Sequence, residues 1–169
     1  PSASPVWPAA GVGLAAVVLC GARIWPGLFL GAFLVTYSTS GQWMMSVGIA
    51  TGNTLESLLG SYLVNRFNEG RRGFDRPGDV WRFFALAGVV STMVAATFGA
   101  ASLFLSGLAR PVELVAIWVT WWLGDAVGVL IAAPLILLWA GSPRIRWTRE
   151  QFVEAALLLA GIVVVGQVL

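Results

Sequence analysis

The sequence predicts an all-α fold: a polytopic bundle of about six membrane-spanning helices. Of its 169 residues, 58% are hydrophobic and only 11% are charged, so the protein surface suits lipid better than water. Long apolar stretches alternate with short polar loops. The arginines gather in alternate loops, which is the pattern expected when each apolar stretch crosses the membrane.

Six apolar segments are expected to form the helices. They are Val6–Ala22, Trp25–Tyr37, Trp43–Phe67, Val80–Ser106, Glu113–Ala140 and the segment from Gln151 onward. The second segment is short, because a span needs about 20 apolar residues. We expect residues 1–169 to be a single integral-membrane module cut from a longer chain at both ends. The sequence begins without an initiator methionine and stops inside an apolar run.

The arginines predict the orientation of this module. One side of the membrane receives Arg23, Arg66, Arg71, Arg72, Arg76, Arg82, Arg144, Arg146 and Arg149, and the other receives only Arg110. Loops rich in arginine stay in the cytoplasm, so the first side is expected to be cytoplasmic. These arginines either only set the topology or also contact anionic lipid or a cytoplasmic partner. Their position near the membrane argues against nucleic-acid binding.

The missing residue types exclude several kinds of chemistry. Histidine is absent, which excludes histidine-ligated haem, histidine-bound zinc and a histidine proton relay. The lone Cys20 cannot form a disulfide within the chain, and its apolar neighbours predict a small core residue. No nucleophile–base pair, phosphate loop or redox motif is visible. We therefore expect no catalytic residue, no cofactor and no enzyme activity in this segment.

Glu56 lies in the middle of the third segment, on a face of small residues. Gly48, Gly52, Glu56 and Gly60 recur every fourth residue and therefore share one face of the helix. Glycine at this spacing lets another helix approach closely. Asn53 lies one turn before the acid and can share its surroundings. Glu56 is therefore expected to face a tight helix seam instead of lipid.

Asp125 lies in the middle of the fifth segment, below a group of tryptophans. Trp118, Trp121 and Trp122 precede it by seven, four and three residues, on or near its face. A second row of small residues consists of Thr120, Gly124, Gly128 and Ala132. An acid below aromatic walls suits a cation or a small polar ligand. The alternative for the tryptophans is an interfacial aromatic belt.

Three interpretations of the two acids remain open. An ionisable group at bilayer depth costs roughly 2.5–3.5 kcal/mol on insertion scales, so it is a candidate for function and for a specific partner. First, Asn53, Glu56 and Asp125 form a ligand or cation site. Second, the acids are a protonated, hydrogen-bonded pair that only joins two helices. Third, they carry a proton-coupled transport step.

Two further rows of small residues predict helix contacts. Gly27 and Gly31 form one row in the second segment, and Ser91, Ala95 and Gly99 form another in the fourth. Both are expected to be packing seams.

Four motifs follow one another along the chain. They are Trp7-Pro8-Ala9-Ala10-Gly11, Trp25-Pro26-Gly27-x-Phe29-x-Gly31-Ala32, Gly52-Asn53-Thr54-Leu55-Glu56 and Trp121-Trp122-Leu123-Gly124-Asp125-x-x-Gly128. In this order the chain, through Pro134, resembles the membrane-associated sensor domain family, MASE type one. Ala9 stands where that family usually has a second proline. The resemblance implies that the positions of this chain that match the family's motifs are Asn53, Glu56, Trp121, Trp122 and Asp125.

The resemblance implies a bacterial integral-membrane input module of about eight helices, attached to a histidine kinase, a diguanylate cyclase or a similar cytoplasmic output domain in the same chain. Family ligands are poorly defined, so the resemblance gives a role without a stimulus. We expect a multi-pass sensor in the bacterial inner (plasma) membrane, often a homodimer. A small ligand, an ion or a partner membrane protein would favour one packing of its helices. The alternatives are a small-molecule transporter, such as the substrate-binding membrane subunit of an uptake system, and a scaffold for another membrane protein.

Overall fold

The computed structural model describes residues 6–67 and 77–141, and these residues form helices connected by short turns. The helices in chain order are α1 (Pro8–Cys20), η1 (Ala22–Ile24), α2 (Trp25–Ser40), α3 (Trp43–Phe67), α4 (Pro77–Phe83), η3 (Phe84–Ser91), α5 (Thr92–Leu105), η4 (Pro111–Glu113) and α6 (Leu114–Gly141). No strand occurs among these residues. The all-α fold class is therefore confirmed.

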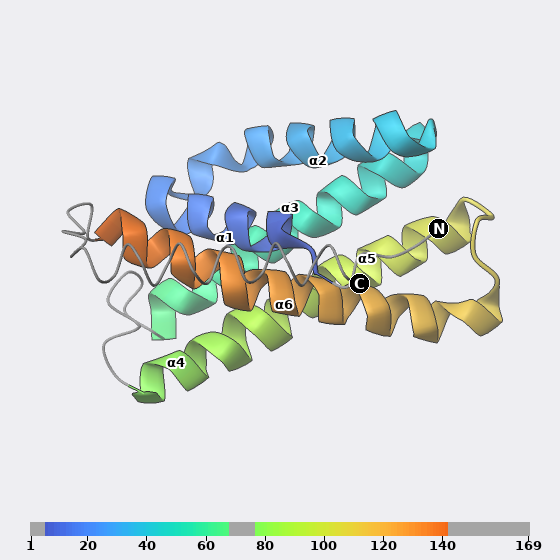
Figure 1. The fold of residues 1–169 in the computed structure, drawn as a ribbon. Coiled ribbons are helices and arrows are strands. Elements are labelled where there is room, and N and C mark those ends of the chain that lie inside the picture. The colour runs from blue at the N-terminus through green and yellow to red at the C-terminus, as the bar shows by residue number, and fades with distance from the viewer. Residues whose placement is uncertain (1–5, 68–76, 142–169) are drawn as a thin grey trace, which may run out of the picture.

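The long helices run antiparallel to one another in a single bundle (Figure 1). The α1–α2 turn, the end of α3 and the start of α4 lie at one end, and the α5–α6 turn lies at the other (Figure 1). The first end carries Arg23, Arg66 and Arg82, while Arg110 belongs to the turn at the opposite end. The four described arginines therefore lie at the two ends of the bundle as the sequence predicts, three at one end and Arg110 at the other.

The expected helix boundaries hold best for the two acid-bearing segments. Helix α3 has the expected bounds, and α6 begins and ends one residue later than expected. Helix α1 ends before the expected Ala22 because Gly21 adopts a φ of +84°, which breaks the helix. Helix α2 continues to Ser40, where Gly41 caps it in the left-handed conformation with a φ of 67°. The segment from Gln151 onward lies outside the described residues.

The expectation of about six spanning helices is not met. Among the described residues, two helices are long and apolar enough to cross a membrane, Gly78–Leu105 and Pro111–Ala140. Helices α1 and α2 have 13 and 16 residues and reach only about 20 and 24 Å at 1.5 Å per residue, against a hydrocarbon core of about 30 Å. Helix α3 has 25 residues, but its polar side chains, Glu56 among them, lower its hydropathy.

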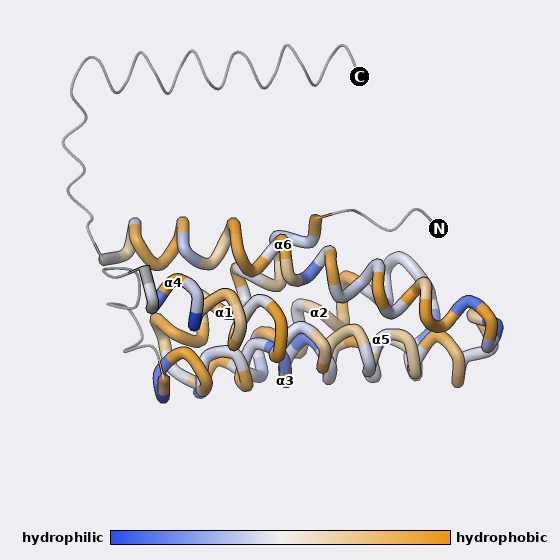
Figure 2. Tube along the Cα trace, turned by 90° about the horizontal axis from the view of Figure 1, so that it is seen from below, coloured by the Kyte–Doolittle hydropathy of each residue, from blue (hydrophilic) through white to orange (hydrophobic). Residues whose placement is uncertain are grey.

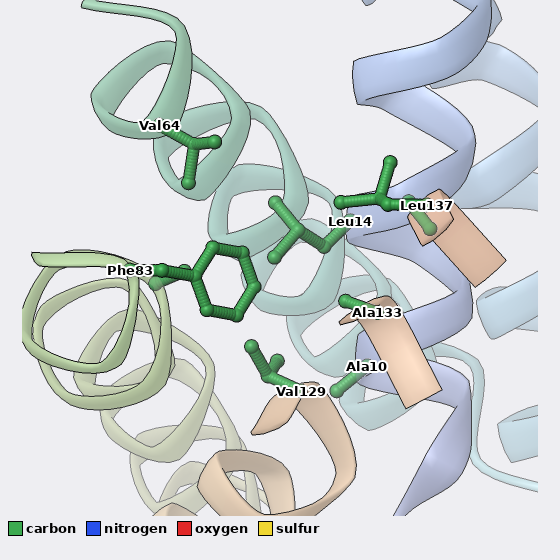
Figure 3. Packing of buried hydrophobic residues seen from close by; sticks show 9 residues of the cluster. Ala10, Leu14, Val64, Phe83, Val129, Ala133 and Leu137 are labelled. Carbon is green, nitrogen blue, oxygen red and sulfur yellow. The ribbon is translucent and has the colours of Figure 1, made fainter. Parts of the chain in front are cut away.

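The apolar core lies toward the arginine-bearing end and joins α1, α3, α4, η3 and α6. Phe83 of α4 points its ring into the centre of this cluster, toward Leu14, Val64 and Val129 (Figure 3). Phe83 is 1% exposed, and its packing fixes the junction of α4 and η3 to α1, α3 and α6. Movement of this junction would therefore disturb the packing of the whole end of the bundle.

Glycines set the close approach of the helices on both sides of the core. A methyl group at Gly128 would collide with the backbone of Trp7, and one at Gly11 would collide with the carbonyl oxygen of Gly128. The Trp7 amide also donates to the Gly124 carbonyl oxygen at 3.0 Å, so α1 and α6 are joined backbone to backbone. On α3, Gly52 leaves room for Phe98, whose Cβ would lie 2.5 Å from a methyl group there. These seams of α3 and α6 confirm the predicted small-residue packing.

Helix α2 lies at the periphery. It contains no buried residue, and nothing lies within 4 Å of a methyl group built at Gly27 or Gly31. The prediction of a packing seam at these two glycines is therefore wrong for the described contacts. Cys20, expected in the core, is exposed at the end of α1. Hydrophilic residues gather mainly at the two ends of the bundle (Figure 2). Large apolar side chains of α2, such as Leu30 and Leu34, are exposed.

We predict that Gly128→Ala destabilises the bundle by about 1–3 kcal/mol, because the new methyl group overpacks the α1–α6 seam. Gly27→Ala is the matched control. It meets open space within a helix, so it should be neutral or stabilise by up to about 1 kcal/mol. Thermal unfolding in detergent micelles compares the two variants. Equal unfolding temperatures would contradict the assigned seam.

The turn between α5 and α6 contains an exposed capping arrangement. Glu113 accepts hydrogen bonds from the Arg110 guanidinium at 2.7 Å and from the Arg110 backbone amide at 2.9 Å. The hydrogen bonds from the Arg110 side chain and backbone, in that order, lower the pKa of Glu113 to about 2. Because the folded pKa is lowered, the stabilisation is present above the ordinary pKa of a glutamate and is lost as the pH falls through about 2.

We predict that Arg110→Ala raises the pKa of Glu113 toward its ordinary value, because only the backbone hydrogen bond then remains. Carboxyl-carbon NMR of the labelled protein in micelles measures this titration. A Glu113 pKa that stays near 2 in the variant would show that the guanidinium is not the main cause.

Candidate functional site

Glu56 is buried in the middle of α3. Glu56 is 2% exposed, and its Oε1 atom makes no hydrogen bond with any described residue. Gly52 before it packs against Ala95 and Phe98, and Gly60 after it packs against Leu14 and Ser91. Since these three residues share one face, Glu56 lies on the side of α3 that packs against η3 and α5, next to α1.

Asp125 is buried in the middle of α6 and is 6% exposed. On one side of it, Gly124 and Gly128 contact the start of α1. On the other side, Trp122 reaches η3. At about 100° per residue, Asp125 lies between these two contacts and faces the inside of the bundle.

The structure brings the two acids into one interior region. Helices α3 and α6 pack mainly against α1 on one side and against η3 and α5 on the other, and they do not pack closely against each other. They are thus diagonal members of a four-helix arrangement, and each presents one acid toward its centre. Facing helices of a bundle commonly build sites in this way.

No basic side chain compensates the two acids among the described residues. The described arginines are Arg23, Arg66, Arg82 and Arg110, and all are exposed near helix ends or in turns. The structure also contains no hydrogen bond between Glu56 and Asp125. A hydrogen bond between them requires one protonated carboxyl group, so the interpretation of a protonated, hydrogen-bonded pair stays a prediction.

The three tryptophans that the sequence analysis placed near Asp125 make their described contacts mainly with η3 and α5. The Trp118 indole donates to Thr97 Oγ1 at 3.0 Å, and its ring stacks on Trp122 with centroids 5.7 Å apart. The ring of Trp121 lies directly against Gly99 of α5, which explains the small residue there. All three tryptophans are half-buried. Their contacts join α6 to α5, so the expected aromatic walls are at least partly structural.

A π-helical segment lies beside the acids, and the sequence analysis did not identify it. This segment, η3, packs against both α3 and α6. Its Val89 carbonyl oxygen accepts hydrogen bonds from the Trp122 indole at 3.2 Å and from Thr92 Oγ1 at 3.1 Å. A π-helix widens the turn and shifts the register of its hydrogen bonds, and such segments are frequent at functional sites. The apolar sequence of η3 carries no signal that would have revealed it.

Asn53 is half-buried on α3, one turn before Glu56. By helical periodicity it lies between Glu56 and Ser57, and Ser57 fills the space beside Gly13 of α1. Asn53 is therefore placed toward α1, at the margin of the region that Glu56 and Asp125 share. The described part of the chain has no cluster of three or more cysteine, aspartate or glutamate side chains that could hold a metal ion.

We predict that Trp122→Phe destabilises the bundle by about 0.5–1.5 kcal/mol and increases hydrogen exchange in η3, because a hydrogen bond to the Val89 carbonyl is lost. Trp139→Phe is the control, since Trp139 is 58% exposed and its indole has no hydrogen bond to a described residue. Hydrogen–deuterium exchange with mass spectrometry measures both variants. Unchanged exchange of residues 84–91 in Trp122→Phe would contradict the assigned contact.

Comparison with known proteins identifies the family of this chain. The MASE1 family model matches residues 1–169, the whole chain. No curated protein and no solved structure gives a significant match. MASE1 is a membrane-associated sensory input domain that is not catalytic by itself. The four ordered motifs, the all-helical bundle and the family match agree: this chain belongs to the MASE1 family of membrane-associated sensory domains.

Proposed function

We propose that this domain is the multi-pass sensory input of a bacterial signalling protein in the inner membrane, and that it receives its signal at Glu56 and Asp125. The observation that carries the proposal is the burial of Glu56, with one carboxylate oxygen unpartnered, across the bundle from a second buried acid. A charge-bearing pair in hydrocarbon is costly unless something compensates it. The state of the pair therefore depends on what binds there.

The arrangement of the helices gives this pair a route to the cytoplasmic side. The pair lies beside η3, and α4 continues directly from η3 to the end of the bundle that carries most of the described arginines. A π-helix has a different hydrogen-bond register from an α-helix, so a change of register in η3 would shift the packing at its junction with α4. A ligand that prefers one packing of α3 and α6 would thereby act on Phe83, which packs in the core at this junction.

The orientation of the bundle indicates which of its ends would face the output domain. The arginine-bearing end is cytoplasmic under the positive-inside rule. A cytoplasmic histidine kinase or diguanylate cyclase domain in the same chain would receive the change. In this proposal Asn53, Trp118, Trp121 and Trp122, which lie on the same two helices as the acids, adjust how the helices pack around them. Homodimer formation and a partner membrane protein stay predictions.

We predict that Glu56→Gln and Asp125→Asn each change the basal output or the stimulated output at least about threefold, because each removes one charge from the receiving pair. Output is measured on the full-length protein in native membranes. Glu113→Gln makes the same chemical change on an exposed carboxyl group and should signal as the wild type.

Membrane insertion of all three variants is checked by protease protection and by the amount of protein in the membrane fraction. Wild-type output from both Glu56→Gln and Asp125→Asn, at normal membrane levels, would refute the role of the pair. Flux of a solute through the domain in proteoliposomes, without any change in output, would instead favour a transporter.

A further inference from the structure

The chemistry of the acid pair indicates the class of ligand that it takes. The pair combines two carboxyl groups with no compensating charge among the described residues, and the Glu56 Oε1 atom is buried without a hydrogen bond. The elements packed around the pair bring no charged group to it: α1, η3 and α5 contain no charged residue, and Cys20 is exposed at the end of α1. A buried acceptor of this kind needs a donor or a cation.

Neighbouring hydroxyl groups do not supply the donor. On the packed faces of α3, η3 and α5, Ser57 donates to the Asn53 carbonyl oxygen at 3.0 Å, Ser91 to that of Ala87 at 2.6 Å, and Thr92 to that of Gly88 at 2.7 Å. Each hydroxyl proton is thus already used within its own helix.

A proton alone does not satisfy the Glu56 carboxyl group either. Protonation removes the charge of Glu56, but it does not bring a donor from another group to Oε1. A small cation near the two carboxyl groups gives the Oε1 atom a partner and compensates one negative charge, and a proton on one of the two carboxyl groups compensates the other. Calcium takes six to eight oxygen ligands, carboxylates among them, and the described residues offer no cluster of three acids.

We propose that Glu56 and Asp125 together bind one small monovalent cation, either an alkali metal ion or a primary ammonium group. This inference rests on the proposed function for its biological meaning, because the cation would be the signal or would set the sensitivity of the sensor. Binding itself depends only on the geometry of the pair. The two statements can therefore fail separately.

The test measures binding to the full-length protein in detergent micelles at fixed pH and ionic strength. Sodium, potassium and methylammonium chlorides are titrated separately against N-methylglucamine chloride, whose cation is too bulky for the tight helix seams. At least one small cation should raise the unfolding temperature with a saturating dependence on concentration. The comparison of the three salts distinguishes a metal ion from an ammonium group.

Matched variants locate the cation. Glu56→Gln and Asp125→Asn should each weaken its affinity at least about tenfold, whereas Glu113→Gln should leave it unchanged. Stabilisation that is equal in the wild type and in the Glu56→Gln/Asp125→Asn double variant would overturn the proposal, because the cation would then bind elsewhere. A wild type that responds to pH but to no small cation would also overturn it, and would assign the pair to protons alone.

A second measurement uses only the wild-type chain, in case the variants do not fold. Dicyclohexylcarbodiimide modifies carboxyl groups in apolar surroundings, and mass spectrometry identifies the modified residue. The bound cation should protect Glu56, with half-protection at the concentration that half-saturates the thermal shift. Labelling of Glu56 that no small cation changes would contradict the proposal. A cation that binds and protects while both variants signal normally would instead refute the proposed function and leave the cation site in place.

Discussion

Two acids in the middle of an apolar bundle, without a basic side chain beside them in the described structure, are the constraint on which the rest of this molecule depends. Burying them costs free energy, and hydrocarbon offers no water to compensate it. The bundle therefore has to enclose them, and it does so with small residues. Glycines on α3 and α6 let α1 and α5 approach closely on either side, so that Glu56 and Asp125 face the interior instead of lipid.

The same packing connects the acids to the π-helical segment η3. Trp122 precedes Asp125 by less than one turn and bonds to the Val89 carbonyl oxygen, inside the π-helical η3. The helix then continues into α4, where Phe83 fills the apolar core. The proposed route from the pair to the end of the bundle expected to face the cytoplasm therefore runs through Trp122, η3 and Phe83.

The sequence predicted the all-helical class, the bounds of α3 and α6 to within one residue, and the burial of both acids. These features could be predicted because helix geometry places residues four apart on one face, where a row of glycines marks close packing. Other features depend on tertiary contacts and leave no such pattern. The seam expected at Gly27 and Gly31 has no partner helix in the described structure. The turns at Gly21 and Gly41 set the lengths of α1 and α2, which hydropathy alone misjudged. The π-helix arises within an ordinary apolar run.

A double-mutant cycle tests most directly whether Glu56 and Asp125 act as one site. The free energy of unfolding is measured for the wild type, Glu56→Gln, Asp125→Asn and the double variant in the same micelles. If the acids share one compensating group, the two effects should be non-additive, with a coupling free energy of at least about 0.5 kcal/mol. Additive effects, within the error of the measurement, would show that the two carboxyl groups are independent and would contradict this account.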